Sequence, residues 1–267
     1  MTTIETQKLA DSFNKDGYLV LKNFFSAEEM PPLLEAIKNA KCAEDSALGL
    51  SKGSMVFRSN VFYKDKYIQR FISQQKIIDL LKTIAGKDIW ARWDQAVGKG
   101  PNSGVFPWHQ DNGYNQLEHQ HYQLWVAITQ SNSENGTIKL CPGSHTSGIF
   151  QHKFDGAHLY YDGDVSNSIM LVAEPGDAIL FSSYLLHATV ANTTKNDTRW
   201  AYVIEYMSLD NFDHTVKSPY FVVAKDGLST QKFIYIHPSI TFKDIKKISV
   251  SKFNSAKRKL KKLLPSN

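Results

Sequence analysis

Cysteine and long apolar runs are both scarce in this chain, and each shortage excludes a class of protein. The only two cysteines in 267 residues, Cys42 and Cys141, do not have the spacing of metal ligands. No stretch approaches ~20 consecutive apolar residues, so a membrane-spanning helix is not expected. The first residues, MTTIETQKLA, lack the basic start and apolar run of a secretory signal. These absences predict a cytoplasmic protein in a reducing compartment.

Charge is unevenly distributed along the chain. Residues 241–267 contain nine Lys or Arg and one acidic residue, a net charge of +8, which leaves 22 basic and 25 acidic residues in 1–240. Two interpretations of this basic tail stay open: a solvated charge run, or a segment that contacts the phosphates of CoA or an acidic carrier protein. We predict no nucleic-acid partner.

The first third of the chain is typical of helices. Residues 7–41 predict a helix, a short strand (YLVL) and a second helix. Ser26 and Glu29 form a capping box for the second helix, although the Pro-Pro pair that follows favours a later start. A further helix is predicted over residues 66–86, with an apolar face made of Ile68, Phe71, Ile72, Ile78, Leu81 and Ile84.

After residue 86 the pattern changes from helical to strand-like. Short apolar runs such as YQLWVAIT, SIMLVAE and RWAYVIEYM alternate with turn signals, including ENG and EPGD. This alternation is typical of an antiparallel β sandwich or barrel. We expect one domain over residues 1–240, with helices over about 1–86 packed on the sheet, followed by the tail at 241–267.

The stretch FPWHQDNGYNQ contains a histidine and an aspartate two positions apart. If this stretch is extended, His109 and Asp111 project to the same side and Gln110 points away. One imidazole and one carboxylate suit a non-haem ferrous site, which needs a second imidazole. Without that second imidazole, the pair is better interpreted as two polar residues in a loop.

A second histidine and an arginine supply what the pair lacks. His187 ends an apolar strand, where a lone histidine is more often a core residue, and Arg199 begins the next apolar run twelve positions later. In a hairpin, Arg199 reaches the cavity toward which His187 points. A buried guanidinium needs an anion, and its planar fork matches a carboxylate. Together these residues predict a metal with a chelating organic acid beside it.

These motifs resemble those of the phytanoyl-CoA dioxygenase (PhyH) family of iron(II)/2-oxoglutarate oxygenases, over roughly residues 10–210. The segments DGYLVLKNFFSAEEM, WHQD, ENGTIKLCPGSH and EPGDAILFSSYLLHATVAN, together with Arg199, occur in the family's order and spacing. The resemblance implies a mainly β protein with flanking helices and a double-stranded β-helix core, the cupin-like jelly roll. It also implies Fe(II) on His109, Asp111 and His187, with 2-oxoglutarate held by Arg199.

The resemblance further implies the lining of the pocket. Its 2-oxoglutarate contacts are Thr189, Trp125, Phe106 and Lys99, and its candidate substrate contacts are Gln95, Asn112 and His145. Trp125 is equally compatible with a core position, and Gln95 and Asn112 with solvated loops. We expect His119 and His121 at the cavity mouth or in solvent, and Cys141 as a small buried hydrophobe.

The implied reaction is a dioxygenase reaction on a small-molecule substrate, with O2 and 2-oxoglutarate converted to succinate and CO2. The carboxylate of Asp111 favours hydroxylation, because similar halogenases have a small residue at that position. Desaturation, ring closure, and action on a CoA- or carrier-bound acyl group are alternatives. A non-catalytic jelly-roll binding protein is a rival from another class, and the presence of all four site residues argues against it.

Overall fold

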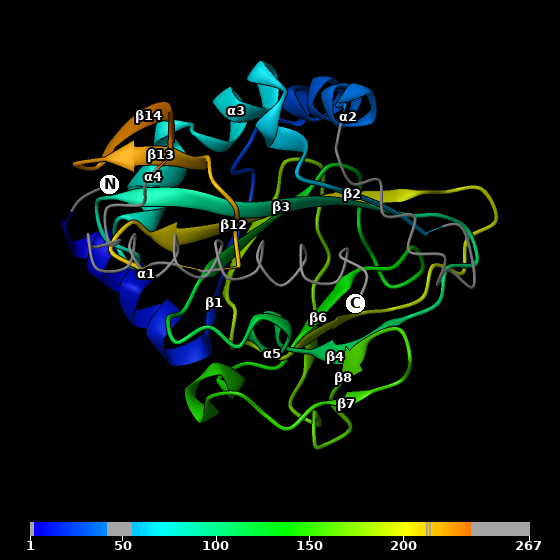
Figure 1. Ribbon diagram of the computed structural model, residues 1–267. Helices are drawn as coiled ribbons and strands as arrows, with labels where there is room; N and C mark the ends of the chain where they lie inside the picture. Colours follow the sequence, from blue (N-terminus) through cyan, green and yellow to red (C-terminus); the bar gives the residue numbers. More distant parts are fainter. Residues whose placement is uncertain (1–2, 42–54, 212, 214, 236–267) are drawn as a thin grey trace, which may run out of the picture.

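Two antiparallel sheets face each other in this protein, and helices cover the outer face of the larger one (Figure 1). The computed structural model describes residues 3–41, 55–211, 213 and 215–235. The helices are α1 Thr3–Asp16, α2 Met30–Asn39, α3 Lys66–Ile72, α4 Gln75–Leu81 and α5 Asp111–Asn115. This arrangement confirms the predicted jelly-roll fold class.

The larger sheet has the strand order β1-β10-β5-β12-β3-β13-β14. Its strands are β1 Tyr18–Leu21, β2 Met55–Ser59, β3 Ile89–Lys99, β5 Tyr122–Ala127, β10 Ala178–Ser182, β12 Arg199–Ser208, β13 Tyr220–Lys225 and β14 Leu228–Ile234. β3 is long enough to pair with β12 along its whole length while its other edge holds β2 at one end and β13 at the other. β3 and β12 therefore form the centre of the sheet.

The smaller sheet has the order β4-β11-β6-β9, with a separate β7-β8 ribbon beside it. Its strands are short: β4 Phe106–His109, β6 Ile138–Leu140, β9 Ile169–Met170, β11 His187–Thr189, and in the ribbon β7 Lys153–Phe154 and β8 Leu159–Tyr160. β11 lies between β4 and β6, so any side chain that it directs inward reaches the middle of the space between the sheets.

Alternating side chains of the larger sheet fill two separate cores. On β5, Leu124 and Val126 belong to the core shared with the helices, whereas Trp125 and Ala127 belong to the core between the sheets. Successive side chains of a strand point to opposite faces, which explains this division. Because both faces are buried, β5 is a nearly continuous apolar run.

The helix predicted over residues 66–86 is instead two helices, α3 and α4. Ser73 ends α3 and donates its hydroxyl hydrogen to the Gln69 carbonyl, and Gln74 then adopts an extended backbone. An unbroken helix would rotate Ile77 and Ile78 away from the face defined by Ile72. The break lets all three isoleucines reach the core.

The predicted capping box is present at Ser26, directly before the 3-10 turn that leads into α2. The Glu29 carboxylate accepts a hydrogen bond from the Ser26 N–H at 2.9 Å. The 3-10 turn, Ala27–Glu29, follows, and α2 begins only at Met30, so the predicted later start of this helix is confirmed. Pro31 and Pro32 fall in the first turn of α2, where backbone N–H groups have no partner within the helix.

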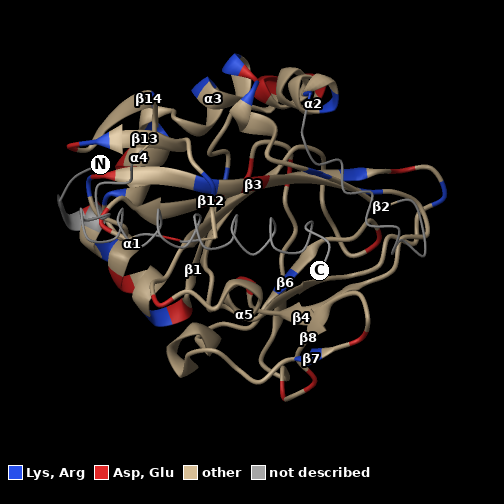
Figure 2. Ribbon diagram, viewed as in Figure 1, with Lys and Arg blue, Asp and Glu red and all other residues tan. Residues whose placement is uncertain are grey.

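Charged residues of both signs are spread along the outer helices α1, α2 and α3 (Figure 2). Within the described ranges, no helix has the length and apolar character needed to cross a bilayer. The basic tail at 241–267 lies outside the described residues, as does Cys42. Cys141 is buried, as predicted.

Asp94 is a fully buried carboxyl on the helix-facing side of β3, and it makes the stability of the protein depend on pH. It accepts hydrogen bonds from the Tyr202 hydroxyl and the Phe62 N–H. Burial raises its pKa from 3.8 to about 7. The folded protein holds this proton up to about pH 7, whereas the unfolded chain releases it near pH 3.8. The contribution to stability is therefore lost as the pH rises through 7.

Relative to Asp94→Asn, the free energy of unfolding of the wild type should fall by about 2 kcal/mol between about pH 5.5 and about pH 8. The Asn variant keeps an acceptor for Tyr202 but has no proton to lose. Urea unfolding of both proteins at both pH values measures the difference. Parallel pH dependence in the two proteins would contradict this account of Asp94.

Candidate active site

Two histidines face each other in the smaller sheet. His109 is the last residue of β4 and His187 is the first of β11, and the antiparallel register pairs them directly. Their ring centroids are 4.1 Å apart. Residues that are directly opposite in an antiparallel pair project from the same face of the sheet. Both imidazoles therefore reach the cavity between the two sheets.

Asp111 joins the two histidines from the turn after β4. The backbone is extended only as far as Gln110, and α5 begins at Asp111, so the aspartate lies at a helix start and not on a continuing strand. Its Oδ1 is 3.5 Å from His109 Nε2 and 3.6 Å from His187 Nε2. Gln110 points away, as predicted, and its side-chain amide bonds the backbone of neighbouring loops.

Backbone carbonyl groups fix the tautomer of both imidazoles. Nδ1 of His109 lies 2.8 Å from the Pro107 oxygen, and Nδ1 of His187 lies 3.0 Å from the Leu185 oxygen. A carbonyl oxygen can only accept, so each Nδ1 carries a hydrogen and donates it. Each Nε2 is left with a lone pair on the side of Asp111, as a metal ligand requires.

The charge states of these residues also suit a metal ion. Burial, together with the neighbouring His109, lowers the pKa of His187 to about 4, so this ring is neutral at pH 7. Burial alone would raise the pKa of Asp111, but in acid the protonated imidazoles outweigh this effect and lower the pKa to about 2, so Asp111 is a carboxylate at pH 7. The ligand atoms of the three residues lie within 4.8 Å of one another. Two neutral imidazoles and one carboxylate are the donor set of non-haem ferrous sites.

The three residues open onto a cavity of about 410 Å³ between the sheets. Most of its wall is aromatic or aliphatic, contributed by Phe57, Trp93, Phe106, Trp125, Phe181 and Val203. Cavities of this size and character bind small molecules, and their few polar groups determine which ones.

One end of the cavity holds two buried basic side chains, Arg199 and Lys99. Arg199 is 1% exposed, and its Nε and Nη2 donate to the Gly136 carbonyl oxygen at 3.1 and 2.8 Å. Lys99 is paired with Arg199 in register and donates to the Thr189 hydroxyl at 2.8 Å. Burial lowers the pKa of Arg199 to about 10, and burial next to Arg199 lowers that of Lys99 to about 7. In the described part of the chain neither pairs with a carboxylate, so this end fits an anion.

The other predicted pocket residues divide into two groups. Phe106, Trp125, Thr189 and Gln95 line the cavity. Trp125 belongs to the core between the sheets, as one of its two predicted roles requires, and its ring centroid is 5.9 Å from the Arg199 guanidinium carbon. Gln95 also donates to the Ser59 hydroxyl at 3.0 Å.

Asn112 and His145 lie elsewhere. Asn112 is fully buried, and its side chain bonds both the N–H and the carbonyl of Leu117, which closes the turn after α5. His145 Nε2 is 3.1 Å from the Asn14 carbonyl oxygen in α1. Neither side chain lines the cavity, because backbone groups outside it hold both of them.

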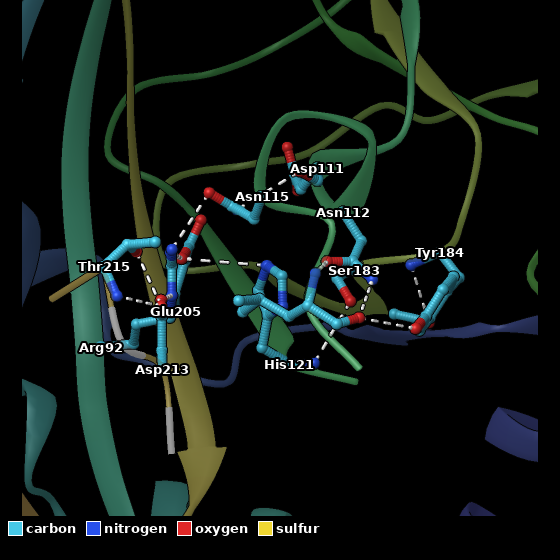
Figure 3. Close-up of polar contacts among 12 residues, drawn as sticks. Arg92, Asp111, Asn112, Asn115, His121, Ser183, Tyr184, Glu205, Asp213 and Thr215 are labelled. Carbon is cyan, nitrogen blue, oxygen red and sulfur yellow. Dashed lines mark hydrogen bonds and ion pairs between the residues drawn. The ribbon is translucent and has the colours of Figure 1, made fainter. Parts of the chain in front are cut away.

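The cavity residues that were not predicted include three polar ones that lie close together: Arg92, Gln123 and Glu205. They lie at the end of β3, β5 and β12 away from Arg199. Figure 3 shows Arg92 and Glu205 beside each other. Gln123 and Glu205 are recognisable in the sequence as polar residues inside the apolar runs YQLWVAIT and RWAYVIEYM.

His121 also differs from its prediction. It is fully buried, with Nε2 3.9 Å from Glu205 Oε2, and not at the cavity mouth or in solvent. Burial lowers its pKa. His119, two residues earlier, is exposed as predicted. β5 begins at Tyr122, so His121 directly precedes the sheet and is covered, whereas His119 lies in the exposed loop before it.

A jelly roll that directs two imidazoles and one carboxylate into its central cavity has the architecture and the ligands of a non-haem iron oxygenase. The family model described as Phytanoyl-CoA dioxygenase (PhyH) matches residues 13–201. The chain belongs to this family.

Among curated relatives, the peroxisomal phytanoyl-CoA dioxygenase of Homo sapiens is 23% identical over 222 residues, which cover 72% of this chain and 65% of the human protein. The methylphosphonate hydroxylase of Gimesia maris is 23% identical over 214 residues, covering 76% of this chain and 81% of that protein. The match to the human enzyme thus spans less than two thirds of its length.

Solved structures share the fold. The epimerase SnoN, in complex with Fe3+, alpha ketoglutarate and nogalamycin RO, is 18% identical with a TM-score of 0.66, over 87% of this chain and 98% of SnoN. The non-heme monooxygenase ThoJ, in its apo form, is 20% identical with a TM-score of 0.68, over 94% of this chain and 96% of ThoJ.

Replacing either cavity imidazole should weaken ferrous iron binding. In His109→Ala and His187→Ala the affinity should fall by more than the ~10–100-fold typical of residues that only orient a ligand. Anaerobic titration with Fe(II) measures it. His158→Ala is the matched control, because His158 lines the same cavity and packs on Phe106 but lies outside the group of three. Equal losses in all three variants would remove the two histidines from the ligand set.

Proposed function

We propose that this protein is an iron(II)/2-oxoglutarate-dependent dioxygenase that hydroxylates a small molecule. The observation that carries the proposal is the presence of His109, Asp111 and His187 on the same cavity as the buried Arg199. A metal site alone does not need a buried guanidinium, and an anion site alone does not need the three ligands. A chelating dicarboxylic acid uses both.

Each site residue has a part in this proposal. His109, Asp111 and His187 hold the iron, and Arg199 binds the distal carboxylate of 2-oxoglutarate through its planar fork. The Lys99 ammonium, which already bonds Thr189, adds a second positive charge beside Arg199. The rest of this pocket is formed by Thr189, Trp125 and Phe106, and Gln95 is the candidate substrate contact.

When bound, iron and 2-oxoglutarate supply the oxidising chemistry, in which 2-oxoglutarate and O2 become succinate and CO2 and the second oxygen atom enters a C–H bond of the substrate. The chain supplies orientation and a dry environment. The Pro107 and Leu185 carbonyl groups hold both rings in the metal-binding tautomer. The aromatic wall excludes water, which strengthens every charge interaction inside the cavity.

The finer features of the proposal rest on composition and packing. The carboxylate of Asp111 favours hydroxylation over halogenation. Scarce cysteine supports a cytoplasmic location, and the packing of α2, α3 and α4 on the larger sheet supports one domain over residues 1–240. Binding of CoA or a carrier protein through residues 241–267 is testable by comparing the chain with and without that tail.

A substrate screen tests the proposed reaction. Purified protein is supplied with Fe(II), ascorbate, 2-oxoglutarate and pools of small metabolites, and succinate formation is followed. Mass spectrometry of any active pool should show a product that has gained one oxygen atom. A protein that binds iron and 2-oxoglutarate, yet forms no succinate above the metal-only rate with any pool, would point to the non-catalytic rival.

Arg199→Leu should weaken 2-oxoglutarate binding while leaving iron affinity nearly unchanged. Loss of a charge-assisted contact in a buried pocket costs roughly 2–5 kcal/mol, or at least ~30-fold in affinity. Calorimetry with 2-oxoglutarate measures the loss, and an iron titration of the same variant is its control. A change below about threefold would move the anchor to another residue, with Lys99 the next candidate.

Asp111→Gly removes one ligand and one negative charge while leaving both imidazoles in place. Succinate formation should fall by well over the ~100-fold limit expected of a residue that only orients His109. The rate is measured at saturating iron, so that weaker metal binding does not mask the result. Recovery to within tenfold of wild type at high iron would make Asp111 an orienting residue.

A further inference from the structure

The end of the cavity away from Arg199 contains a buried polar cluster centred on Arg92 (Figure 3). Each nitrogen of the Arg92 guanidinium donates one hydrogen bond: Nε to Asp213, Nη1 to Glu205, and Nη2 to Asn115 at 3.0 Å. The second carboxylate oxygen of Asp213 accepts from the N–H and hydroxyl of Thr215. Each nitrogen of the Arg92 guanidinium and both carboxylate oxygens of Asp213 therefore have a partner within the protein.

Two cavity-lining side chains of this cluster keep free polar atoms. Glu205 gives one carboxylate oxygen to Arg92, and its Oε1 has no hydrogen-bond partner in the described ranges. Gln123 is fully buried, and neither its amide nitrogen nor its amide oxygen has a partner there. Such groups are uncommon in folded proteins because leaving them unpaired is costly. The cluster thus presents two acceptor oxygens and one amide donor to the cavity.

The charge of the cluster points to a cation. Arg92 contributes one positive charge, while Glu205 and Asp213 contribute one negative charge each, so the buried cluster is left with one excess negative charge. His121, beside Glu205, does not neutralise it, because burial favours the uncharged imidazole. An anionic ligand group would face an excess carboxylate here, and a hydroxyl would leave the excess uncompensated.

Hydrogen bonds through Asn115 connect the cluster to Asp111, one of the three metal-binding residues. Asn115 accepts from Arg92 through Oδ1, and its Nδ2 donates to the carbonyl oxygen of Asp111 at 3.3 Å. Asp111 and Asn115 begin and end the single turn of α5, so the cluster is about one helical turn, ~5 Å, from the start of α5. A ligand group held at Glu205 would place the atoms attached to it near the two imidazoles.

We propose that Glu205 Oε1 and the Gln123 amide bind the protonated amine of the primary substrate, a small molecule with an ammonium head and an apolar body. The role of substrate rests on the proposed function, whereas the ammonium site rests on the cluster itself. An ammonium has several N–H donors for the two free oxygens and the charge that the cluster lacks. The aliphatic and aromatic wall, including Trp93, Phe181 and Val203, accommodates the remainder.

Matched probes test the ammonium site without turnover. Protein loaded with Fe(II) and 2-oxoglutarate in the absence of oxygen is titrated by calorimetry with propyl-, hexyl- and benzylammonium. The same titrations use 1-hexanol and hexanoate, which match hexylammonium in length. At least one ammonium ion should bind at least tenfold more tightly than the alcohol and the carboxylate. Equal binding of the three hexyl compounds, or no binding by any ammonium ion, would overturn the proposal.

Two substitutions locate the site. Glu205→Gln removes the charge with little change of shape and should weaken ammonium binding at least tenfold, whereas Glu174→Gln, an exposed change outside the cavity, should not. Gln123→Met removes the unpaired amide, so it should lose several-fold in ammonium affinity while the ligand-free protein unfolds at the same or a higher temperature. If Glu205→Gln fails to fold, Gln123→Met alone tests whether the cluster binds the ammonium ion. Wild-type ammonium affinity in a folded Gln123→Met protein would overturn the assignment.

Separate measurements distinguish failure of this inference from failure of the proposed function. Ammonium binding that depends on Glu205 or Gln123, in a protein that forms no succinate with any amine, would support the site and reject the reaction. Succinate formation driven by a neutral or anionic substrate, with no ammonium binding, would support the reaction and reject the site.

Discussion

The antiparallel pairing of β4 with β11 is the constraint on which the rest of the site depends. It sets His109 opposite His187, and carbonyl groups of the same two chain segments fix both tautomers. Strands this short have little stability of their own. The core between the sheets holds them in place, because Ile138 and Leu140 of β6 pack with Trp125 and other side chains of the larger sheet. The metal-binding geometry is therefore a property of both sheets together.

The larger sheet separates opposite charges along the cavity. β3 ends at Lys99 and β12 begins at Arg199, and these two residues are paired. About six residues away along the same strands lie Arg92 and Glu205, a separation of roughly 20 Å. A dicarboxylate is attracted to the first end and repelled from the second, and an ammonium ion shows the reverse preference. Strand register alone fixes this order, so two small ligands can share one cavity without exchanging places.

Strong local signals in the sequence predicted the fold class and the central residues. The histidine-x-aspartate pair, the second histidine after an apolar strand and Arg199 at the start of the next run all reach one cavity. The break at Ser73 was missed because each half repeats with helical period, although an unbroken helix would not align Ile77 and Ile78 with Ile72. The partners of Asn112 and His145 were not predictable, because the first depends on how the chain turns after α5 to bring Leu117 back, and the second on where α1 places Asn14. In the sequence, Gln123 and Glu205 are only polar residues that interrupt apolar runs. The register of β5 and β12, which places them side by side, shows that they belong to one cluster.

Lys99 and Arg199 are two buried basic side chains that pair with no carboxylate in the described part of the chain, and this has a consequence for stability. Burying positive charge without a counter-ion lowers the stability of the ligand-free fold, and a bound dicarboxylate returns that stability. Under the proposed function, 2-oxoglutarate at a hundred times its dissociation constant adds about 2.7 kcal/mol to the free energy of unfolding. Co-substrate supply would then govern how many molecules stay folded and escape proteolysis, as well as how fast each one works.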